Sequence, residues 1–210
     1  MIDFLWPRTC AVRDCGRKMD RAGYICSRCY ASLPWFDDCP SAAFAYLADI
    51  PELIGIYKFN NGRYLADGFA DAMELAIRKK HPASEIDLVV PVPLHPKRLA
   101  ERGFNQSALL AEKLAARLNR ACNQSALTRL RDTPHQSRST GDERRKQIAA
   151  AFRATDASQI RGRTILLIDD VATTGATLDE CTSALRTAGA YRVIPFTLAK
   201  ALLDEDLDGH

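Results

Sequence analysis

The chain has 210 residues, 47% of them hydrophobic and 26% charged, which is enough to bury one sizeable core plus a minor addition. No apolar stretch approaches the roughly 18 residues that a membrane span requires, and residues 1–8 lack the apolar segment of a secretory signal. We therefore expect a cytoplasmic protein without a membrane span. A net charge of +3 is too small to indicate a nucleic-acid partner by itself.

Five of the seven cysteines precede residue 40, so we predict a cysteine-rich module over residues 1–40 and a main domain over residues 41–210. The short-spaced pairs are Cys10 with Cys15 and Cys26 with Cys29. In a chain without an export signal, two such pairs indicate a tetrahedral Zn²⁺ site rather than disulfides. Cys39 is an alternative ligand, because the first pair is more widely spaced than usual, and unrelated thiols are the plain alternative.

The main domain alternates predicted helices and strands, and we expect an α/β fold with a parallel-sheet core and helices on both faces. Apolar residues recur every four positions in two predicted helices, Leu65, Phe69, Met73 and Ile77 in the first and Leu110, Leu114 and Leu118 in the second. Predicted strands cover residues 86–92, 126–130, 165–168 and 192–198. Pro195 suggests an edge position or a bulge in the last strand.

Other segments carry weaker local signals. Residues 94–106 look like a loop after a strand. Thr140 and Glu143 form a possible capping box before a helix at residues 144–152. Cys122 and Cys181 occur in helical contexts, where a free cysteine is usually a small buried hydrophobe.

The most informative segment runs from Thr164 to Thr177. Its aliphatic start is typical of a central parallel strand, and Asp169 and Asp170 follow as exposed carboxylates at the sheet's carboxyl end, where open α/β sheets bind ligands. Residues 172–177 then supply one glycine and three threonine hydroxyls before a helix, whose free amides favour a phosphate. A solvated acidic turn and a threonine N-cap are the plain alternative. The unbroken order favours a phosphorylated sugar as ligand.

This segment resembles the signature of the type I phosphoribosyltransferases. In that family the acidic pair, here Asp169 and Asp170, holds the ribose 2′- and 3′-hydroxyls of phosphoribosyl pyrophosphate, and the following loop wraps the 5′-phosphate. The resemblance therefore implies one ligand site formed by Asp169, Asp170, Val171, Ala172, Thr173, Thr174, Gly175, Ala176 and Thr177.

The rest of the chain makes the resemblance more specific. Over nearly the whole chain, the sequence resembles the ComF competence-protein family. The resemblance rests on the four-cysteine module, the tripeptide Tyr57-Lys58-Phe59, the run from Val90 to Gln106, a loop at residues 136–145 and the Asp-Asp-Val signature. The resemblance implies a type I phosphoribosyltransferase-like core after a zinc module. The sequence departs from the family in its wide first cysteine pair and its lone Cys39.

The resemblance also implies how the site works. Loss of pyrophosphate places negative charge on the leaving group, so the site needs cations and exclusion of water. Mg²⁺ would be bound largely through substrate oxygens and waters. Arg98 and Arg102 are the expected counter-charges, and a flap at residues 131–146 would bring Arg144 or Arg145 to the leaving group. An exposed, solvated charge is the plain alternative for each arginine.

Two functions follow from this sequence. The first is a phosphoribosyltransferase with an unknown acceptor. The second is an accessory protein of DNA uptake that binds a phosphoribosyl ligand and contacts single-stranded DNA or DNA-uptake proteins, through the zinc module and basic residues. Release of pyrophosphate in the presence of candidate acceptor bases would distinguish the two.

Overall fold

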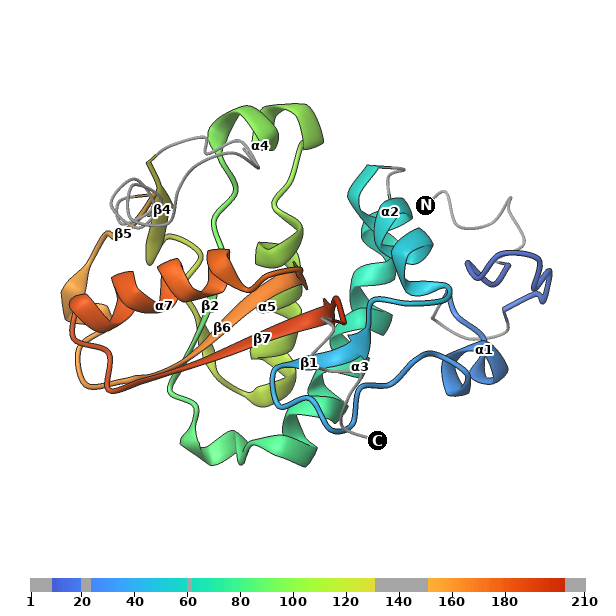
Figure 1. Ribbon diagram of the computed structural model, residues 1–210, viewed down its shortest axis with the longest axis horizontal. Helices are drawn as coiled ribbons and strands as arrows, with labels where there is room; N and C mark the ends of the chain where they lie inside the picture. Colours follow the sequence, from blue (N-terminus) through green and yellow to red (C-terminus); the bar gives the residue numbers. More distant parts are fainter. Residues whose placement is uncertain (1–8, 20–23, 60–61, 131–150, 203–210) are drawn as a thin grey trace.

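A computed structural model describes residues 9–19, 24–59, 62–130 and 151–202 (Figure 1). The core is a five-stranded sheet of order β1-β7-β6-β2-β3, and every neighbouring pair is parallel. A separate antiparallel pair, β4 with β5, lies beside it. The predicted parallel α/β core is therefore confirmed. Within the part of the chain described here, none of the helices has the length and apolar character to cross a membrane.

The strands are β1 Ala42–Ala45, β2 Leu88–Pro91, β3 Ala121–Cys122, β4 Leu127–Arg129, β5 Phe152–Ala154, β6 Thr164–Ala172 and β7 Arg192–Lys200. The α-helices are α1 Ser27–Ala31, α2 Ile50–Phe59, α3 Ala66–Lys80, α4 Pro96–Arg102, α5 Gln106–Leu118 and α7 Ala176–Thr187. Three short 3₁₀ helices complete the described elements, η1 Gly62–Leu65, η2 Ala83–Glu85 and η3 Ala157–Gln159.

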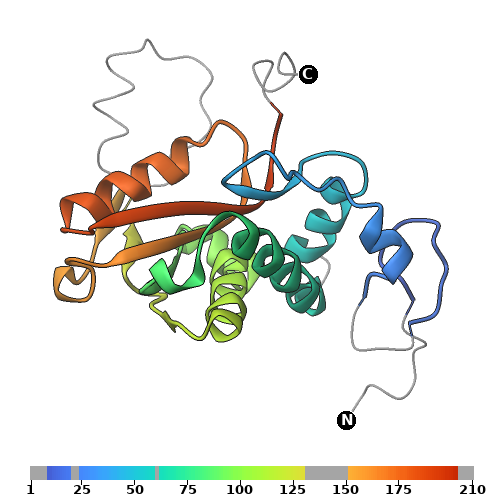
Figure 2. The ribbon, with the colours of Figure 1, turned by 90° about the horizontal axis from the view of Figure 1, so that it is seen from below.

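Helices cover both faces of the sheet, with α3 and α5 on one side and α7 on the other (Figure 2). The alternating pleat of β6 explains this arrangement, because successive side chains point to opposite faces. Leu166 and Ile168 belong to the core formed with α3 and α5, whereas Ile165 and Leu167 belong to the core formed with α7. The apolar residues predicted to line the first two helices are all buried, which confirms both assignments.

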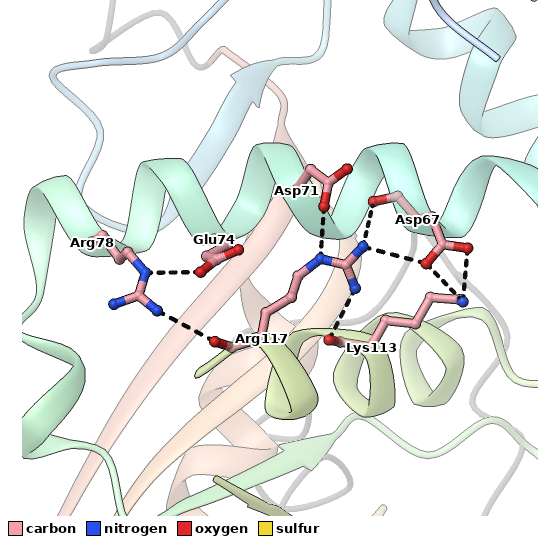
Figure 3. Close-up of polar contacts among 6 residues, drawn as sticks. All are labelled: Asp67, Asp71, Glu74, Arg78, Lys113 and Arg117. Atoms are coloured by element: carbon pink, nitrogen blue, oxygen red, sulfur yellow. Dashed lines mark hydrogen bonds and ion pairs between the residues drawn. The ribbon is translucent and has the colours of Figure 1, made fainter. Parts of the chain in front are cut away.

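Polar contacts join α3 and α5 alongside their apolar contact (Figure 3). The Lys113 ammonium lies 2.8 Å from Asp67 Oδ1, and the Arg117 Nε lies 2.7 Å from Asp71 Oδ1. Arg117 also reaches Asp67, at 3.3 Å. A shared network of ion pairs therefore joins α3 and α5, the two helices that cover this face of the sheet.

The cysteine-rich module packs against the main domain. Cys10, Val12, Cys26 and Leu33 are buried in the same apolar core as α2 and α3. At its edge the ring of Tyr24 lies 4.1 Å from that of Tyr64 in η1, and Arg13 pairs with Glu52 of α2 at 3.1 Å. The module thus contacts both α2 and η1. Its boundary at residue 40 stays a prediction.

Several local predictions were wrong. Residues 94–106 are not a continuous loop, because α4 occupies Pro96–Arg102 and α5 begins at Gln106. Cys122 lies in β3 rather than a helix, and Phe152 lies in β5 rather than at the end of a helix. Residues 144–150 of that predicted helix, with the capping pair Thr140 and Glu143, fall outside the described residues.

Pro195 lies in β7, which is an interior strand of the sheet, so the predicted edge position was also wrong. The structure shows why proline is tolerated there. Thr197, two residues later, donates its amide to Ser41 O at 2.8 Å, just before β1 begins. By the alternation of a strand, the nitrogen of Pro195 faces the same side, where β1 has not yet started and no ladder donor is needed.

Candidate functional site

The candidate site forms where β6 runs past its neighbour β2. The last paired residue of β2 is Pro91, opposite Ile168, whereas β6 continues to Ala172 alongside β7. Asp169 and Asp170 therefore stand at the carboxyl edge of the sheet, as the sequence predicted. They are not exposed, however, with only 8% and 4% of their surfaces accessible. Each is covered by a residue from another element.

Asp169 is covered by the start of α5. The Ser107 hydroxyl donates to Asp169 Oδ1 at 2.8 Å, and the Asp170 amide donates to the same oxygen at 2.9 Å. Asn105 fixes this helix start by accepting from the Ser107 amide and donating its side-chain amide to Val92 O. Burial, followed by the neighbouring Asp170 charge, raises the pKa of Asp169 to about 7.

Asp170 is covered by the end of α2. The Lys58 ammonium lies 2.6 Å from Asp170 Oδ2, and the Val171 amide donates to Oδ1 at 2.9 Å. Lys58 keeps only 20% of its side-chain surface exposed in this pair. Beside it, the Tyr57 hydroxyl donates to Gln106 O at 2.8 Å, which joins α2 to the start of α5. The carboxylates of two residues adjacent in β6 are thus each contacted by a side chain from a different helix.

Sequence reasoning did not assign Lys58 to the site. The signal was present in the tripeptide Tyr57-Lys58-Phe59, which served only to identify the family. A lysine near the end of an amphipathic helix usually remains in solvent, so its type and position gave no reason to pair it with an aspartate 112 residues away. Ser107 was missed for the same reason, because hydroxyls at helix starts usually serve as caps.

The loop after β6 fits an anion. Thr173, Thr174 and Ala176 are exposed, and Gly175 adopts a left-handed φ of 79° just before α7. Residues with a Cβ rarely adopt this backbone conformation, which explains the glycine. The N-cap residue Gly175 has no side chain to cap α7, and the first amide, that of Ala176, makes only a long contact of 3.5 Å with the Thr174 hydroxyl. Such a helix start attracts a phosphate.

Of the two predicted arginines in α4, the structure brings Arg102 toward the acidic pair. Burial lowers the pKa of Arg102, and the charges of Asp170 and Asp169 partly offset that effect. Its guanidinium carbon lies 4.9 Å from the centre of the Phe59 ring, so it stacks on the residue after Lys58. Arg98 is exposed. Arg144 and Arg145 lie outside the described residues.

The four cysteines of the module converge on one point. The sulfur atoms of Cys10, Cys15, Cys26 and Cys29 all lie within 4.8 Å of one another. Cys15 Sγ is 3.7 Å from Cys26 Sγ and 3.4 Å from Cys29 Sγ. A Zn²⁺ ion bound tetrahedrally at about 2.3 Å separates its sulfur ligands by roughly 3.8 Å. The spacing therefore fits zinc.

The electrostatics of the cluster also suit a cation. The Cys29 amide lowers the pKa of Cys26 to about 7, whereas burial raises that of Cys10 and Cys29. The four thiols are therefore not equivalent, and one of them forms a thiolate readily. Cys39 lies apart from the cluster, with its sulfur 3.5 Å from the Ser41 hydroxyl. The structure thus favours the original four cysteines over the alternative ligand.

A pocket of about 310 Å³ opens beside this cluster. Three arginines line it, Arg13, Arg17 and Arg28, with Cys15 and Cys29 in its wall. Asp14 is the acidic residue among the lining side chains. Arg13 is paired with Glu52, so Arg17 and Arg28 are the cations through which this pocket would attract a phosphate group.

Comparisons with known proteins agree with this geometry. A model of the phosphoribosyl transferase domain matches residues 105–208. The chain is 29% identical over 191 residues to Competence protein F of Haemophilus influenzae, covering 89% of this chain and 83% of that protein. The chain belongs to the ComF competence-protein family. Two further ComF relatives are the DNA utilization protein YhgH of Escherichia coli O157:H7 and Competence protein ComFC of Bacillus subtilis.

YhgH is 29% identical over 191 residues, covering 90% of this chain and 83% of its own length. ComFC is 31% identical over 161 residues, covering 76% of this chain and 63% of its own length. The matched domain begins at Asn105, the cap of α5, and includes Ser107 and the acidic pair. Lys58, Arg102 and the four cysteines of this ComF chain lie outside that matched range.

Proposed function

We propose that this ComF family member binds phosphoribosyl pyrophosphate together with Mg²⁺ and transfers its phosphoribosyl group to an acceptor. The observation that carries the proposal is the buried Asp169 and Asp170 pair, followed without interruption by an exposed anion-binding loop at the start of α7. A sugar phosphate has groups that match both features: its vicinal hydroxyls match the acidic pair, and its phosphate matches the loop.

Each group has a proposed role. The ribose hydroxyls donate to the carboxylates of Asp169 and Asp170, in place of Ser107 and Lys58. The amides of the loop and the hydroxyls of Thr173 and Thr174 hold the 5′-phosphate. Because Lys58 and Arg102 bring positive charge to the same edge, they stabilise the pyrophosphate that leaves C1.

Mg²⁺ fits this site because both aspartates are oxygen ligands and the substrate adds its own oxygens. When bound, it supplies charge neutralisation for the pyrophosphate. The protein residues near it orient the ribose and limit access of water. Arg144 and Arg145 remain predicted partners of the leaving group.

Calorimetry with phosphoribosyl pyrophosphate and Mg²⁺ tests the proposal. We expect Asp170→Asn to weaken binding by about tenfold to a hundredfold, the cost of one charge-assisted hydrogen bond of roughly 1.5–3 kcal/mol. Thr174→Val should weaken binding through the 5′-phosphate. Asparagine is preferred to alanine because alanine would leave Lys58 beside a hole, so the loss of binding would be mixed with a loss of stability.

Asp156→Asn is the matched control, since Asp156 caps η3 before the amino end of β6, at the other end of the strand from the acidic pair, and bonds Ser158. It should bind like the wild type. Wild-type protein that fails to bind, or an Asp169 and Asp170 double variant that binds equally well, would overturn the proposal. Release of pyrophosphate with a panel of bases then tests whether binding leads to turnover.

A second candidate function is contact with single-stranded DNA, which the arginine-lined pocket of the module favours. If Arg17 and Arg28 contact phosphates, replacing both by glutamine should lower the slope of log affinity against log salt by about 1.4. Fluorescence anisotropy with a short oligonucleotide measures that slope. Arg186→Gln, on the exposed side of α7, is the control, and an unchanged slope in the double variant would exclude the pocket.

The names of two relatives, a competence protein and a DNA utilization protein, support DNA-uptake proteins as proposed partners. A four-thiol metal site is stable in a reducing compartment, which supports the cytoplasm as the proposed location. We propose Zn²⁺ as the metal of the module on the sulfur spacing given above.

A further inference from the structure

Phe59 is an exposed aromatic residue at the edge of the ribose site. It ends α2 and keeps 70% of its surface accessible. The preceding residue, Lys58, contacts Asp170 at 2.6 Å. The ring is therefore only one residue along the chain from a side chain that touches a proposed ribose-binding carboxylate.

Arg102 holds the ring in place from one side. Its guanidinium carbon lies over the ring, 4.9 Å from the centroid. The same arginine is partly buried and lies within electrostatic reach of both aspartates. One face of the ring is therefore covered by a cation that itself belongs to the site, while the large exposed area leaves the rest of the ring open to a ligand.

A second contact of the same kind stiffens this edge. Arg63 of η1 donates to Gly103 O at 3.0 Å, and its guanidinium lies 4.5 Å from the centre of the Phe104 ring. The 3₁₀ helix η1 is thus tied to Gly103 and Phe104, the two residues after Arg102. A ring held between two anchored segments has little conformational freedom to lose when a flat ligand stacks on it.

We propose that Phe59 is the stacking platform for a planar heterocycle carried at, or transferred to, C1′ of the bound ribose. C1′ is the neighbour of C2′, so a group on it lies next to the 2′-hydroxyl and the carboxylate that holds it. The ligand class is then a nucleotide or a nitrogenous base, rather than an aliphatic acceptor. This inference rests on the proposed function and assigns the acceptor side of the same site.

Calorimetry with ligands that differ only at C1′ tests the inference without requiring turnover. Ribose 5-phosphate has no base, whereas adenosine and cytidine 5′-monophosphates add one to the same sugar phosphate. Stacking of one base on an aromatic side chain is expected to tighten binding by about fivefold to a hundredfold. We expect the wild type to show this advantage for both nucleotides.

Phe59→Ala should remove the advantage while leaving ribose 5-phosphate binding unchanged, and Phe59→Trp should restore it. Tyr191→Ala is the matched control, because Tyr191 is 80% exposed but lies just before β7, at the opposite end of the sheet. It should behave like the wild type. Circular dichroism of each variant checks that the fold is retained.

The outcomes separate this inference from the proposed function. No binding of ribose 5-phosphate by the wild type would contradict the proposed function itself. Binding of ribose 5-phosphate without a base advantage, or an equal loss for all ligands in Phe59→Ala, would overturn the platform alone. If a 5′-phosphorylated oligonucleotide binds the wild type and binds more weakly to Phe59→Ala, the source of the heterocycle is a nucleic-acid strand. If the oligonucleotide does not bind, the source is a free base or nucleotide.

Discussion

Asp169 and Asp170 are neighbours in the chain, yet the structure gives them different chemical surroundings. Asp169 accepts from a neutral hydroxyl and an amide, whereas Asp170 faces the ammonium of Lys58. Burial disfavours a charge on Asp169, and the neighbouring charge of Asp170 disfavours it further. Placing a cation beside only one of them leaves the other, Asp169, to hold a proton near neutral pH.

The first prediction concerns the proton on Asp169. Its pKa of about 7 in the folded chain lies above the ordinary value of 3.8, so the folded state binds more protons between these values. The free energy of unfolding contributed by Asp169 therefore falls as the pH rises from 3.8 to about 7. Asp169→Asn removes this dependence, so the variant should gain stability relative to the wild type between about pH 5 and about pH 8.

Urea denaturation of the wild type and Asp169→Asn at about pH 5 and about pH 8 measures the difference in their free energies of unfolding. The contributions of other titrating groups cancel in that difference. Asp67→Asn serves as the control, because ion pairing lowers the pKa of Asp67 and leaves it charged throughout this range. An Asp169→Asn difference that does not change with pH would show that Asp169 is charged in the folded protein.

At this scale the sequence located the acidic pair and its loop, because both come from one uninterrupted segment. It did not locate Lys58 or Ser107, which lie on helices and precede the acidic pair by more than 60 residues. It also predicted exposed carboxylates, since a strand end alone does not show what covers it. A continuous segment of sequence therefore predicts the residues of one loop, whereas the side chains that contact them from other helices depend on tertiary packing.

Among the helices, α4 is one that the sequence missed, because residues 94–106 were predicted to be a loop. Its seven residues include none that is buried, so it lacks the apolar periodicity by which helices are recognised. The helix signals that were present are Pro96 at its start and Gly103 in the left-handed conformation at its end. By contrast, α3 and α5 bury whole apolar stripes, and the sequence predicted both.

The second prediction follows from that exposure. Because α4 is short and rests on Arg102 and Gly103 rather than on a buried face, its amides should exchange with solvent much faster than those of α5. If Arg102 faces the pyrophosphate, phosphoribosyl pyrophosphate with Mg²⁺ should slow the exchange in α4. Hydrogen exchange followed by mass spectrometry measures both, and equal protection of α4 and α5 in the free protein would contradict the prediction.

The third prediction concerns the metal of the cysteine-rich module. Purified protein should contain about one zinc per chain, and Cys26→Ser should lose it and unfold the module locally, since small metal modules depend on the ion for folding. Elemental analysis and proteolysis of residues 9–40 measure the two effects. Because Cys39 lies outside the sulfur cluster, Cys39→Ser should retain the metal, and loss of zinc in this variant alone would change the ligand set.

For the whole molecule, the ion network between α3 and α5 predicts how stability responds to salt and acid. Arg117 bridges Asp67 and Asp71 while its own side chain is only 22% exposed. Arg117→Met should therefore lower the free energy of unfolding by about 1 kcal/mol, and the loss should shrink at about 1 M salt, where charges are screened.

The same network contributes stability that is lost on acidification. Hydrogen bonding from Lys113 holds the pKa of Asp67 below its ordinary 3.8, so the contribution is present above that value and disappears as the pH falls through the folded pKa. Arg186→Met, on α7, is the matched control for urea denaturation. A loss in Arg117→Met that is the same at low and high salt would point to packing rather than charge.

The strand order also governs the sequence of events during synthesis. In the five-stranded sheet β1 is an edge strand whose neighbour is β7, and Ser41, just before β1, accepts a hydrogen bond from Thr197 across 156 residues of chain. At ribosomal rates of about 5–20 residues per second, β1 emerges roughly 8–30 s before its partner exists. During that interval α2 has no completed sheet against which to place Lys58, so we expect the proposed ribose-phosphate site to form only after β7 has been made.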